Sequence, residues 1–316
     1  MKKITSVFIS LLLLSLCGCE ANTDTADTRF MLDTVVNISA ECTKETLDGA
    51  FLLCQELEKK LSRTIENSDV WRLNNSDGFI EVGEDTEKII DRSLYYSEIS
   101  GGKFDITVYA ISSLWDFNEA VVPSKNEIAE ALKNVDYEAI EKSGSSYNLN
   151  GKKIDLGSVA KGYIADRILD YFKQNQVKNG TINLGGNVIV FGNRQKVGIA
   201  RPFSEDTIAI LNIENASAVT SGIYQRYIEE NENFYHHIID TSTGYPVENS
   251  LLSVTVIGES SLECDALSTV LMLEGLEKGL EIINETDSYE AVFIEKGEKI
   301  TLSDGLIQKN NNIYLK

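Results

Sequence analysis

The segment from Ile154 to Asp166 constrains the fold most, because its pattern specifies a change of secondary structure within a few residues. It predicts a short strand, a turn at Gly157 and then a helix. The helix is indicated by apolar residues with a period of about 3.6, namely Ala160, Tyr163, Ile164, Ile168, Tyr171 and Phe172. A helix start leaves backbone N–H groups unpaired, and such groups can bind phosphate. Lys161 would add positive charge there, but an ordinary strand–turn–helix connection has the same pattern, so both interpretations stay open.

The first residues have the pattern of a targeting segment. Lys2 and Lys3 form a positive start, and residues 7–16 form an apolar run. That run is too short to span a bilayer as a helix of the mature protein. We therefore expect residues 1–18 to be a signal peptide and leave them out of the fold.

The end of this segment resembles a bacterial lipobox, with Cys19 as the lipidated residue. Cys17 is the competing position, although the bulky Leu16 before it suits the signal peptidase less well. A plain secretory signal is the alternative. We expect residues 19–28 to be a polar tether and residues 29–316 to form one folded domain. The expected location is the outer side of the bacterial cytoplasmic membrane, with palmitate or a similar lipid as the anchor.

Composition excludes several classes of protein. The chain has 316 residues, 42% of them apolar, with only 3 Pro, which is typical of a folded protein. Its formal charge of −20 would repel nucleic acid, so a nucleic-acid partner is not expected. Beyond the signal segment, Cys42, Cys54 and Cys264 give an odd count without a close pair, which argues against a disulfide framework. With only 2 histidines, which are adjacent in sequence, a zinc site of two or three histidines is excluded.

The order of the expected elements is a mixed α+β pattern rather than a strict alternation of strand and helix. Residues 29–40 predict a first strand, and helices and then strands follow. Residues 181–190 predict a strand that contains the pair Gly185 and Gly186, which indicates a bulge or a bend. A late helix starts at Ser260, with Glu263 as its expected capping-box partner.

Three side chains of the second half could carry chemistry. Asp265 and Thr269 lie one turn apart on the late helix, and their oxygens are ligands of the kind that Mg²⁺ takes. Two such ligands do not make a site, and an acidic residue in a first helical turn is also favoured by the helix dipole. If His236 faces solvent, His237 is the one imidazole that could act as an acid or base, although a lone histidine is commonly structural.

Eight segments, in this order, resemble the ApbE family of FAD:protein FMN transferases. They extend over about residues 29–305, and together they are far more specific than any one of them. The segments are FMLDT (30–34), GKFDIT (102–107), LWDF (114–117), DLGSVAKGY (155–163), NLGGN (183–187), TSGIY (220–224), HIIDTSTG (237–244) and DALST (265–269). The resemblance implies an ApbE-like, T-fold-related α+β fold of mixed sheets with packed helices.

The resemblance also implies roles for individual residues. Mg²⁺ would be held by the side chains of Asp265 and Thr269 and by the backbone carbonyl of Ser158. His237 would be the base that activates the acceptor hydroxyl. The FAD substrate would contact residues that are spread along the chain, namely Met31, Lys103, Phe104, Asp105, Asp155, Lys161 and Ile239. At position 64 a flavin-contacting Tyr is frequent in the family, and this chain has Thr64 instead.

The implied reaction is a Mg²⁺-dependent transfer of the FMN part of FAD to a Thr or Ser hydroxyl of a target flavoprotein, with release of AMP. Membrane redox-complex subunits and extracellular electron-transfer flavoproteins are the expected targets. One alternative is a FAD pyrophosphatase, in which water replaces the protein hydroxyl and free FMN is released. A second alternative is a flavin-binding lipoprotein without catalysis.

Overall fold

A computed structural model describes residues 23–230 and 233–316. The expected signal peptide (1–18) and the expected lipidation site, Cys19, lie outside the described residues. None of the helices in the described part of the chain is long and apolar enough to cross a membrane.

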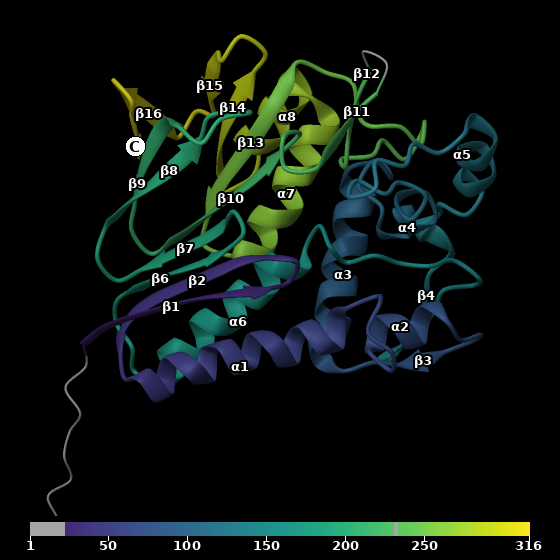
Figure 1. The fold of residues 1–316 in the computed structure, drawn as a ribbon, viewed down its shortest axis with the longest axis horizontal. Helices are drawn as coiled ribbons and strands as arrows, with labels where there is room; N and C mark the ends of the chain where they lie inside the picture. Colours follow the sequence, from purple (N-terminus) through teal and green to yellow (C-terminus); the bar gives the residue numbers. More distant parts are fainter. Residues whose placement is uncertain (1–22, 231–232) are drawn as a thin grey trace, which may run out of the picture.

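An antiparallel sheet of eight strands organises the fold (Figure 1). Every neighbouring pair in it is antiparallel. In spatial order its strands are β1 (Thr23–Met31), β2 (Thr34–Cys42), β6 (Gly180–Leu184), β7 (Asn187–Phe191), β10 (Ala216–Gly222), β13 (Leu251–Gly258), β14 (Glu290–Glu295) and β15 (Ile300–Leu302).

The two faces of this sheet are covered differently. On one face lie α1 (Lys44–Leu61), α6 (Ala160–Gln174) and α7 (Ser261–Glu274), followed by α8 (Leu276–Asn284). On the other face lies a smaller sheet in the order β16 (Leu306–Lys309), β17 (Asn312–Leu315), β9 (Thr207–Ile213) and β8 (Gln195–Ala200). Side chains alternate along a strand, so on β10 Val219 joins the helical core while Ala218 joins the core under the small sheet.

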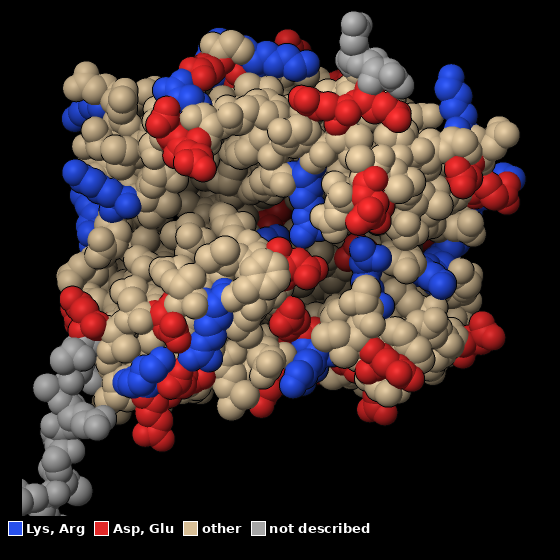
Figure 2. All heavy atoms as spheres, viewed as in Figure 1, with Lys and Arg blue, Asp and Glu red and all other residues tan. Residues whose placement is uncertain are grey.

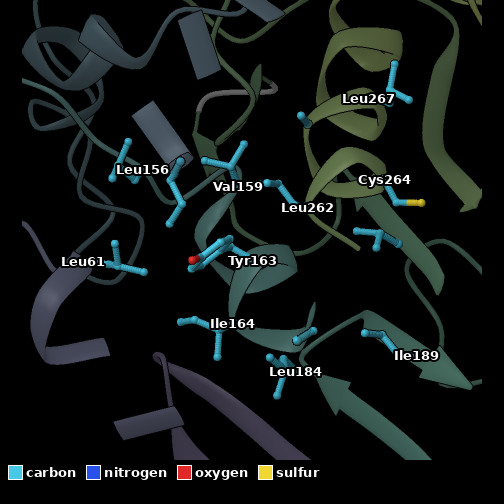
Figure 3. Packing of buried hydrophobic residues seen from close by; sticks show 14 of the residues in the cluster. Leu61, Leu156, Val159, Tyr163, Ile164, Leu184, Ile189, Leu262, Cys264 and Leu267 are labelled. Carbon is cyan, nitrogen blue, oxygen red and sulfur yellow. The ribbon is translucent and has the colours of Figure 1, made fainter. Parts of the chain in front are cut away.

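Helices α6 and α7 contribute many residues to the helical core. Figure 3 shows Tyr163 and Ile164 of α6 between Leu61 of α1 and Leu184 of β6, with Leu262 of α7 on the other side. Tyr163, Ile164 and Leu262 are all at most 2% exposed. The apolar period that predicted a helix after Gly157 is therefore confirmed, and the stripe is the buried face of α6.

The remaining elements lie together beside α7, on the right in Figure 1. The helical ones are α2 (Asp69–Asn74), α3 (Glu84–Ile99), the short η1 (Ile106–Val108), α4 (Tyr109–Ser112), α5 (Lys125–Leu132) and η2 (Tyr137–Ala139). The strands are β3 (Ile80–Glu81), β5 (Ser146–Asn148) and β4 (Glu141–Ser143) in one small sheet, and the hairpin of β11 (Tyr227–Glu230) and β12 (Asn233–His236). A separate apolar cluster around Trp115 and Ile239 joins α4, α5 and this hairpin.

The α+β prediction is confirmed, but two expected strands are hairpins. Residues 23–28, expected as part of a tether, pair with β2, and the chain reverses at Leu32 and Asp33, which both have φ 55°. Likewise Gly185 (φ 60°) and Gly186 (φ 99°) form the reversal between β6 and β7 rather than a bulge within one strand. Two consecutive residues with positive φ form the tight turn that matches strand twist, which explains both reversals.

Two further local predictions were wrong. Residues 154–156 are not a strand, because Asp155 N–H bonds to the carbonyl of Ile106 in a loop rather than to a sheet neighbour. Ser260 does cap α7 by accepting the N–H of Glu263, but the expected reciprocal bond is missing. The Glu263 carboxylate instead pairs with Arg92 of α3 at 2.5 Å, so a charged partner from another helix replaces the backbone.

Candidate functional site

The centre of the candidate site is the junction between α6 and α7. Gly162 N–H of α6 donates a 2.9 Å hydrogen bond to Oδ2 of Asp265 on α7, and Asp265 is only 4% exposed. A Cβ atom at Gly162 would lie 2.3 Å from the carbonyl oxygen of Ser261, so only glycine permits this approach. The helices therefore bring two segments of the chain together at a buried carboxylate.

The turn before α6 places Ser158 at the same junction. Gly162 N–H is the group that would normally bond to the carbonyl of Ser158 in the first helical turn. Because that N–H is used by Asp265, no donor in residues 23–230 or 233–316 bonds to the Ser158 carbonyl. A carbonyl without a helical partner at a helix start is available to a ligand.

Thr269 completes the junction from α7 and β10. Its hydroxyl lies 3.3 Å from the carbonyl of Asp265 and 3.4 Å from the hydroxyl of Ser221 on β10. Ser221 in turn is 2.8 Å from the Ser268 hydroxyl. Asp265 is buried, whereas Thr269, one helical turn later, is partly exposed. The two side chains therefore extend from the interior toward the surface.

Charge at this junction is balanced by Lys161 and polar groups. Burial raises the pKa of Asp265, and the positive charge of Lys161, the Gly162 N–H and the Asn187 side chain act in the opposite direction. The Nδ2 atom of Asn187 is buried and forms no hydrogen bond of ordinary geometry with the described residues. A buried carboxylate that is costly to ionise, beside an amide nitrogen without a well-formed hydrogen bond, is consistent with a site that receives a ligand.

The oxygen atoms at the junction fit a hard cation. One carboxylate, one hydroxyl and one carbonyl are the donor types that Mg²⁺ accepts beside water and phosphate oxygens. Among the described residues there is no cluster of three or more His, Cys, Asp or Glu that could hold a metal ion. The expected ligands Asp265, Thr269 and Ser158 contain a single acidic side chain, so a metal held here would depend on water and substrate oxygens for its other ligands.

The two neighbouring histidines differ in exposure, and His236 is the buried one. His236 is only 5% exposed, and its Nε2 lies 3.1 Å from the carbonyl of Val247. His236 therefore does not face solvent, because it ends β12 with its ring turned inward. His237 is partly exposed, and its Nδ1 lies 3.3 Å from the carbonyl of Arg226.

The pKa of His237 depends on burial and on nearby charges, including that of Lys161 at the junction. Its pKa is lowered to about 4, mainly by desolvation. Repulsion from Arg226 and Lys161, and from His236 once that ring is protonated, acts in the same direction, and the hydrogen bond to the Arg226 carbonyl acts against it. The ring of Phe117 lies edge-on, with centroids 6.4 Å apart. Lys161 thus acts on both Asp265 and His237, and the imidazole is neutral near pH 7.

Asp155 lies at the turn, paired with a residue that sequence reasoning missed. Its Oδ2 forms a 3.1 Å ion pair with Nε of Arg63, and its Oδ1 accepts the N–H of Gly157 at 2.9 Å. The Arg63 guanidinium also lies 4.9 Å from the ring centre of Tyr109. Nothing in the local pattern distinguishes Arg63 from other basic residues after a helix. Its one sequence signal is its position next to Thr64, where the resemblance noted above implies a flavin contact in other chains.

The Lys103–Asp105 turn offers less side-chain surface than expected. Phe104 and Asp105 are 2% and 6% exposed, and Asp105 caps η1 by accepting N–H and hydroxyl bonds from Thr107. Lys103 pairs with Glu274 at the end of α7, at 2.6 Å. A flavin contact at Phe104 or Asp105 would therefore depend on the backbone. The neighbouring Thr241 hydroxyl bonds to the Gly102 carbonyl at 2.8 Å.

The last two expected flavin contacts lie apart from each other. Met31 ends β1 at the tip of the first hairpin and is partly buried. That tip meets the β6–β7 tip, since a Cβ atom at Gly185 would lie 2.2 Å from the Thr34 hydroxyl. Ile239 is 6% exposed, belongs to the Trp115 cluster and bridges to Pro246. The face in Figure 2 is hollowed near its centre, where α6 and α7 approach these hairpin tips, and side chains of both charges line the hollow.

A cavity of about 190 Å³ lies on the other side of the central sheet. Ala218 and Thr220 of β10 line it, together with Ile199 and Leu211 of the small sheet. Ser221, the next residue of β10, points toward α7 instead. The sheet therefore separates this cavity from Asp265.

Comparison with known proteins agrees with this arrangement. A sequence profile of the ApbE family matches residues 32–293. The FAD:protein FMN transferase of Klebsiella pneumoniae (strain 342) is 35% identical over 263 residues, which cover 80% of this chain and 83% of that protein. The FAD:protein FMN transferase of Treponema pallidum (strain Nichols) is 29% identical over 291 residues, covering 83% of this chain and 80% of that protein.

A solved structure leads to the same conclusion. The crystal structure of the ApbE protein from Thermotoga maritima superposes with a TM-score of 0.82 at 30% identity, covering 89% of this chain and 97% of that one. The expectation of an ApbE-like α+β fold is thereby confirmed. Because both the profile and the relatives span most of the sequence, the chain belongs to the ApbE family.

Proposed function

We propose that this chain is an FAD:protein FMN transferase, which moves the FMN part of FAD to a Thr or Ser hydroxyl of a target flavoprotein and releases AMP. The observation that carries the proposal is the hydrogen bond from Gly162 N–H to Asp265, which brings the Ser158 turn and Lys161 at the start of α6 against Asp265 and Thr269 of α7. In this proposal the cation ligands, the positive charge of Lys161 for a phosphate group and the neutral imidazole of His237 act at one site. Mere binding of a flavin would not need this combination.

Asp265, Thr269 and the Ser158 carbonyl would hold Mg²⁺. The bound ion would supply neutralisation of the negative charge on the pyrophosphate of FAD. Gly162 N–H keeps the Asp265 carboxylate in place through its bond to Oδ2. Lys161, in the first turn of α6, would bind a phosphate oxygen of the same pyrophosphate.

His237 would take the proton of the acceptor hydroxyl. A carbonyl can only accept a hydrogen bond, so the Nδ1 that faces Arg226 carries the proton of the neutral ring. The lone pair is then on Nε2, which would receive the hydroxyl proton as the acceptor oxygen forms a bond to the FMN-side phosphorus. The bond between that phosphorus and the bridging oxygen breaks, AMP leaves with the electron pair, and FMN remains on the acceptor as a phosphoester.

The location and the target are part of the same proposal. Lipidation of Cys19 would hold the domain at the outer side of the cytoplasmic membrane, next to membrane redox-complex subunits or extracellular electron-transfer flavoproteins. Labelling cells with a palmitate analogue tests the anchor. Label should be lost in Cys19→Ser and kept in Cys17→Ser, and the reverse pattern would move the anchor to Cys17.

One experiment tests the function. The mature protein is incubated with FAD, Mg²⁺ and a flavin-free acceptor domain, and the acceptor is weighed by intact-protein mass spectrometry. A mass gain of one FMN with an equal amount of AMP is the expected result. Free FMN and AMP without a mass gain would instead indicate a FAD pyrophosphatase, and unchanged FAD would indicate a binding protein.

A further inference from the structure

Three aromatic side chains form an exposed surface beside the β11–β12 hairpin. Tyr227 of β11 and Phe234 of β12 are stacked, with ring centroids 4.9 Å apart. Phe203, from the connection between β8 and β9, meets both rings edge-on at 5.7 Å and 5.6 Å. Phe203 is 52% exposed and Tyr227 is 39% exposed. We call Phe203, Tyr227 and Phe234 the aromatic surface.

The backbone holds Phe203 at the surface. Its φ of 58° lies in the left-handed region, which is unfavourable for a bulky side chain. The turn around it is closed by hydrogen bonds from Ser204 N–H to the Arg201 carbonyl and from Arg201 N–H to the Asp206 carbonyl. The turn thus keeps the Phe203 ring at the surface, next to the hairpin rings, instead of in the core.

The aromatic surface lies next to the end of the hairpin that carries His237, because Tyr227 pairs with the preceding residue, His236. Tyr227 directly follows Arg226, whose carbonyl oxygen receives both the N–H of His237 (3.1 Å) and the approach of its Nδ1 (3.3 Å). Tyr227 is also paired in register with His236. Tyr227 and Phe234 therefore lie on the face of the hairpin that carries His236, and His237 follows at the end of β12. A macromolecule bound to the aromatic surface could extend around this end of the hairpin to bring a hydroxyl to His237.

The charges around the aromatic surface select the kind of partner. Glu205 and Asp206 on one side and Glu229 and Glu230 on the other are all exposed, and Arg226 is the exposed basic residue beside them. Acidic side chains also gather over the end of β11 and β12 in Figure 2. An aromatic centre with a charged rim is the anatomy of a protein interface, and the acidic rim repels anionic lipid headgroups.

We propose that the aromatic surface is the docking surface for the acceptor flavoprotein. It would bind a segment of that protein with an apolar side chain over Phe203 and Tyr227 and with Lys or Arg facing Glu229 and Glu230. This inference rests on the proposed transferase function, because that function requires a protein hydroxyl at His237.

The test measures transfer against acceptor concentration. The probe is the purified, flavin-free domain of an extracytoplasmic electron-transfer flavoprotein with one acceptor Thr, and a variant with Val at that Thr is the blank. Phe203→Ala and Tyr227→Ala should each raise the acceptor KM about tenfold, as expected for central aromatic contacts. The kcat at saturating acceptor and the KM for FAD should not change.

Phe79→Ala is the matched control, because Phe79 is an equally exposed phenylalanine (50%) beside β3, far from the hairpin in Figure 1. It should leave the acceptor KM unchanged. Replacing Glu229 and Glu230 together by Lys should raise the acceptor KM and remove most of its dependence on salt. An acceptor KM equal to that of the wild type in both aromatic variants would overturn the proposal.

Direct binding separates this inference from the function. Binding of the flavin-free acceptor to the FAD-free enzyme is measured by biolayer interferometry for the wild type and Phe203→Ala. If Phe203→Ala weakens binding but the wild type attaches no FMN, the docking surface stands and the transferase function fails. If the wild type attaches FMN and Phe203→Ala binds equally well, the function stands and the docking surface fails.

Two other partners for the aromatic surface give different results. Sedimentation would show a wild-type dimer that Phe203→Ala converts to a monomer if the surface joins two copies of this chain. Vesicles of phosphatidylcholine and phosphatidylglycerol would bind the wild type and not Phe203→Ala if the surface contacts lipid. Either result, with acceptor binding unchanged, would contradict the proposal.

Discussion

The backbone N–H of Gly162 and the carboxylate of Asp265, 103 residues apart in the chain, are joined by a hydrogen bond of 2.9 Å. This bond connects the turn that contains Ser158 to the helix that contains Thr269. It also takes the N–H that the Ser158 carbonyl would otherwise use. The contact therefore both assembles the proposed cation site and leaves one of its oxygens unpaired.

Asp265→Asn should abolish Mg²⁺-dependent AMP release, with a loss of at least about 100-fold. The reason is that an amide keeps the shape of the side chain but removes the charge that would attract the cation. Burial raises the pKa of Asp265, so its ionised form weakens the fold as pH rises above the usual carboxyl range. When both proteins are measured without metal, the melting temperature of Asp265→Asn should therefore equal or exceed that of the wild type. Undiminished AMP release would remove Asp265 from the metal site.

Gly162→Ala should lower the free energy of unfolding by about 1–3 kcal/mol, because the new Cβ would meet backbone that cannot move aside. Urea denaturation measures the change. Gly279→Ala is the control within a helix, since the nearest atom to its Cβ is a ring atom of Phe293 at 3.1 Å and the ring can shift. An equal or smaller loss at Gly162 than at Gly279 would show that α6 and α7 can separate without cost.

The imidazole of His237 should stay neutral down to about pH 5. Its pKa is lowered to about 4, as is that of His236, and the chain has only 2 histidines, so NMR can follow both rings. In the unfolded chain a histidine is protonated below about pH 6.5. The stability due to the neutral rings is therefore present above that pH and is lost as pH falls from about 6.5 to 4. A titration midpoint of His237 near 6.5 would contradict this description of its surroundings.

Lys161→Met should raise the pKa of His237, because the charge of Lys161 lowers it in the wild type. The same substitution should raise the pKa of Asp265, because the positive charge that favours its carboxylate is removed. It should also raise the KM for FAD, because the same charge would bind the pyrophosphate. NMR titration measures the two pKa values, and steady-state kinetics measures the KM for FAD. Lys173→Met, near the exposed end of the same helix, is the matched control and should change neither. An unchanged His237 midpoint in Lys161→Met would separate Lys161 from the base.

Much of the helical framework could be read from local patterns. The predicted buried stripe of α6 agrees with the structure, because side-chain period is a property of neighbouring residues. Caps are local in the same way, as in the capping box that Ser124 and Glu127 form at the start of α5. The reversals at Leu32 and at Gly185 were missed. A glycine pair is compatible with both a bulge and a turn, and only pairing with a partner strand separates the two.

The sequence by itself determined that the chain is an α+β protein, which residue types are available for catalysis, and that its motifs resemble one family. Only the tertiary structure decided that Gly162 binds Asp265, that His236 is the buried histidine and that Arg63 pairs with Asp155. It also brought Phe203 against Tyr227 from a separate connection. The physical reason is that caps, turns and periodicity are local, whereas these contacts depend on how elements pack. That packing is set by the burial of whole surfaces and not by any one motif.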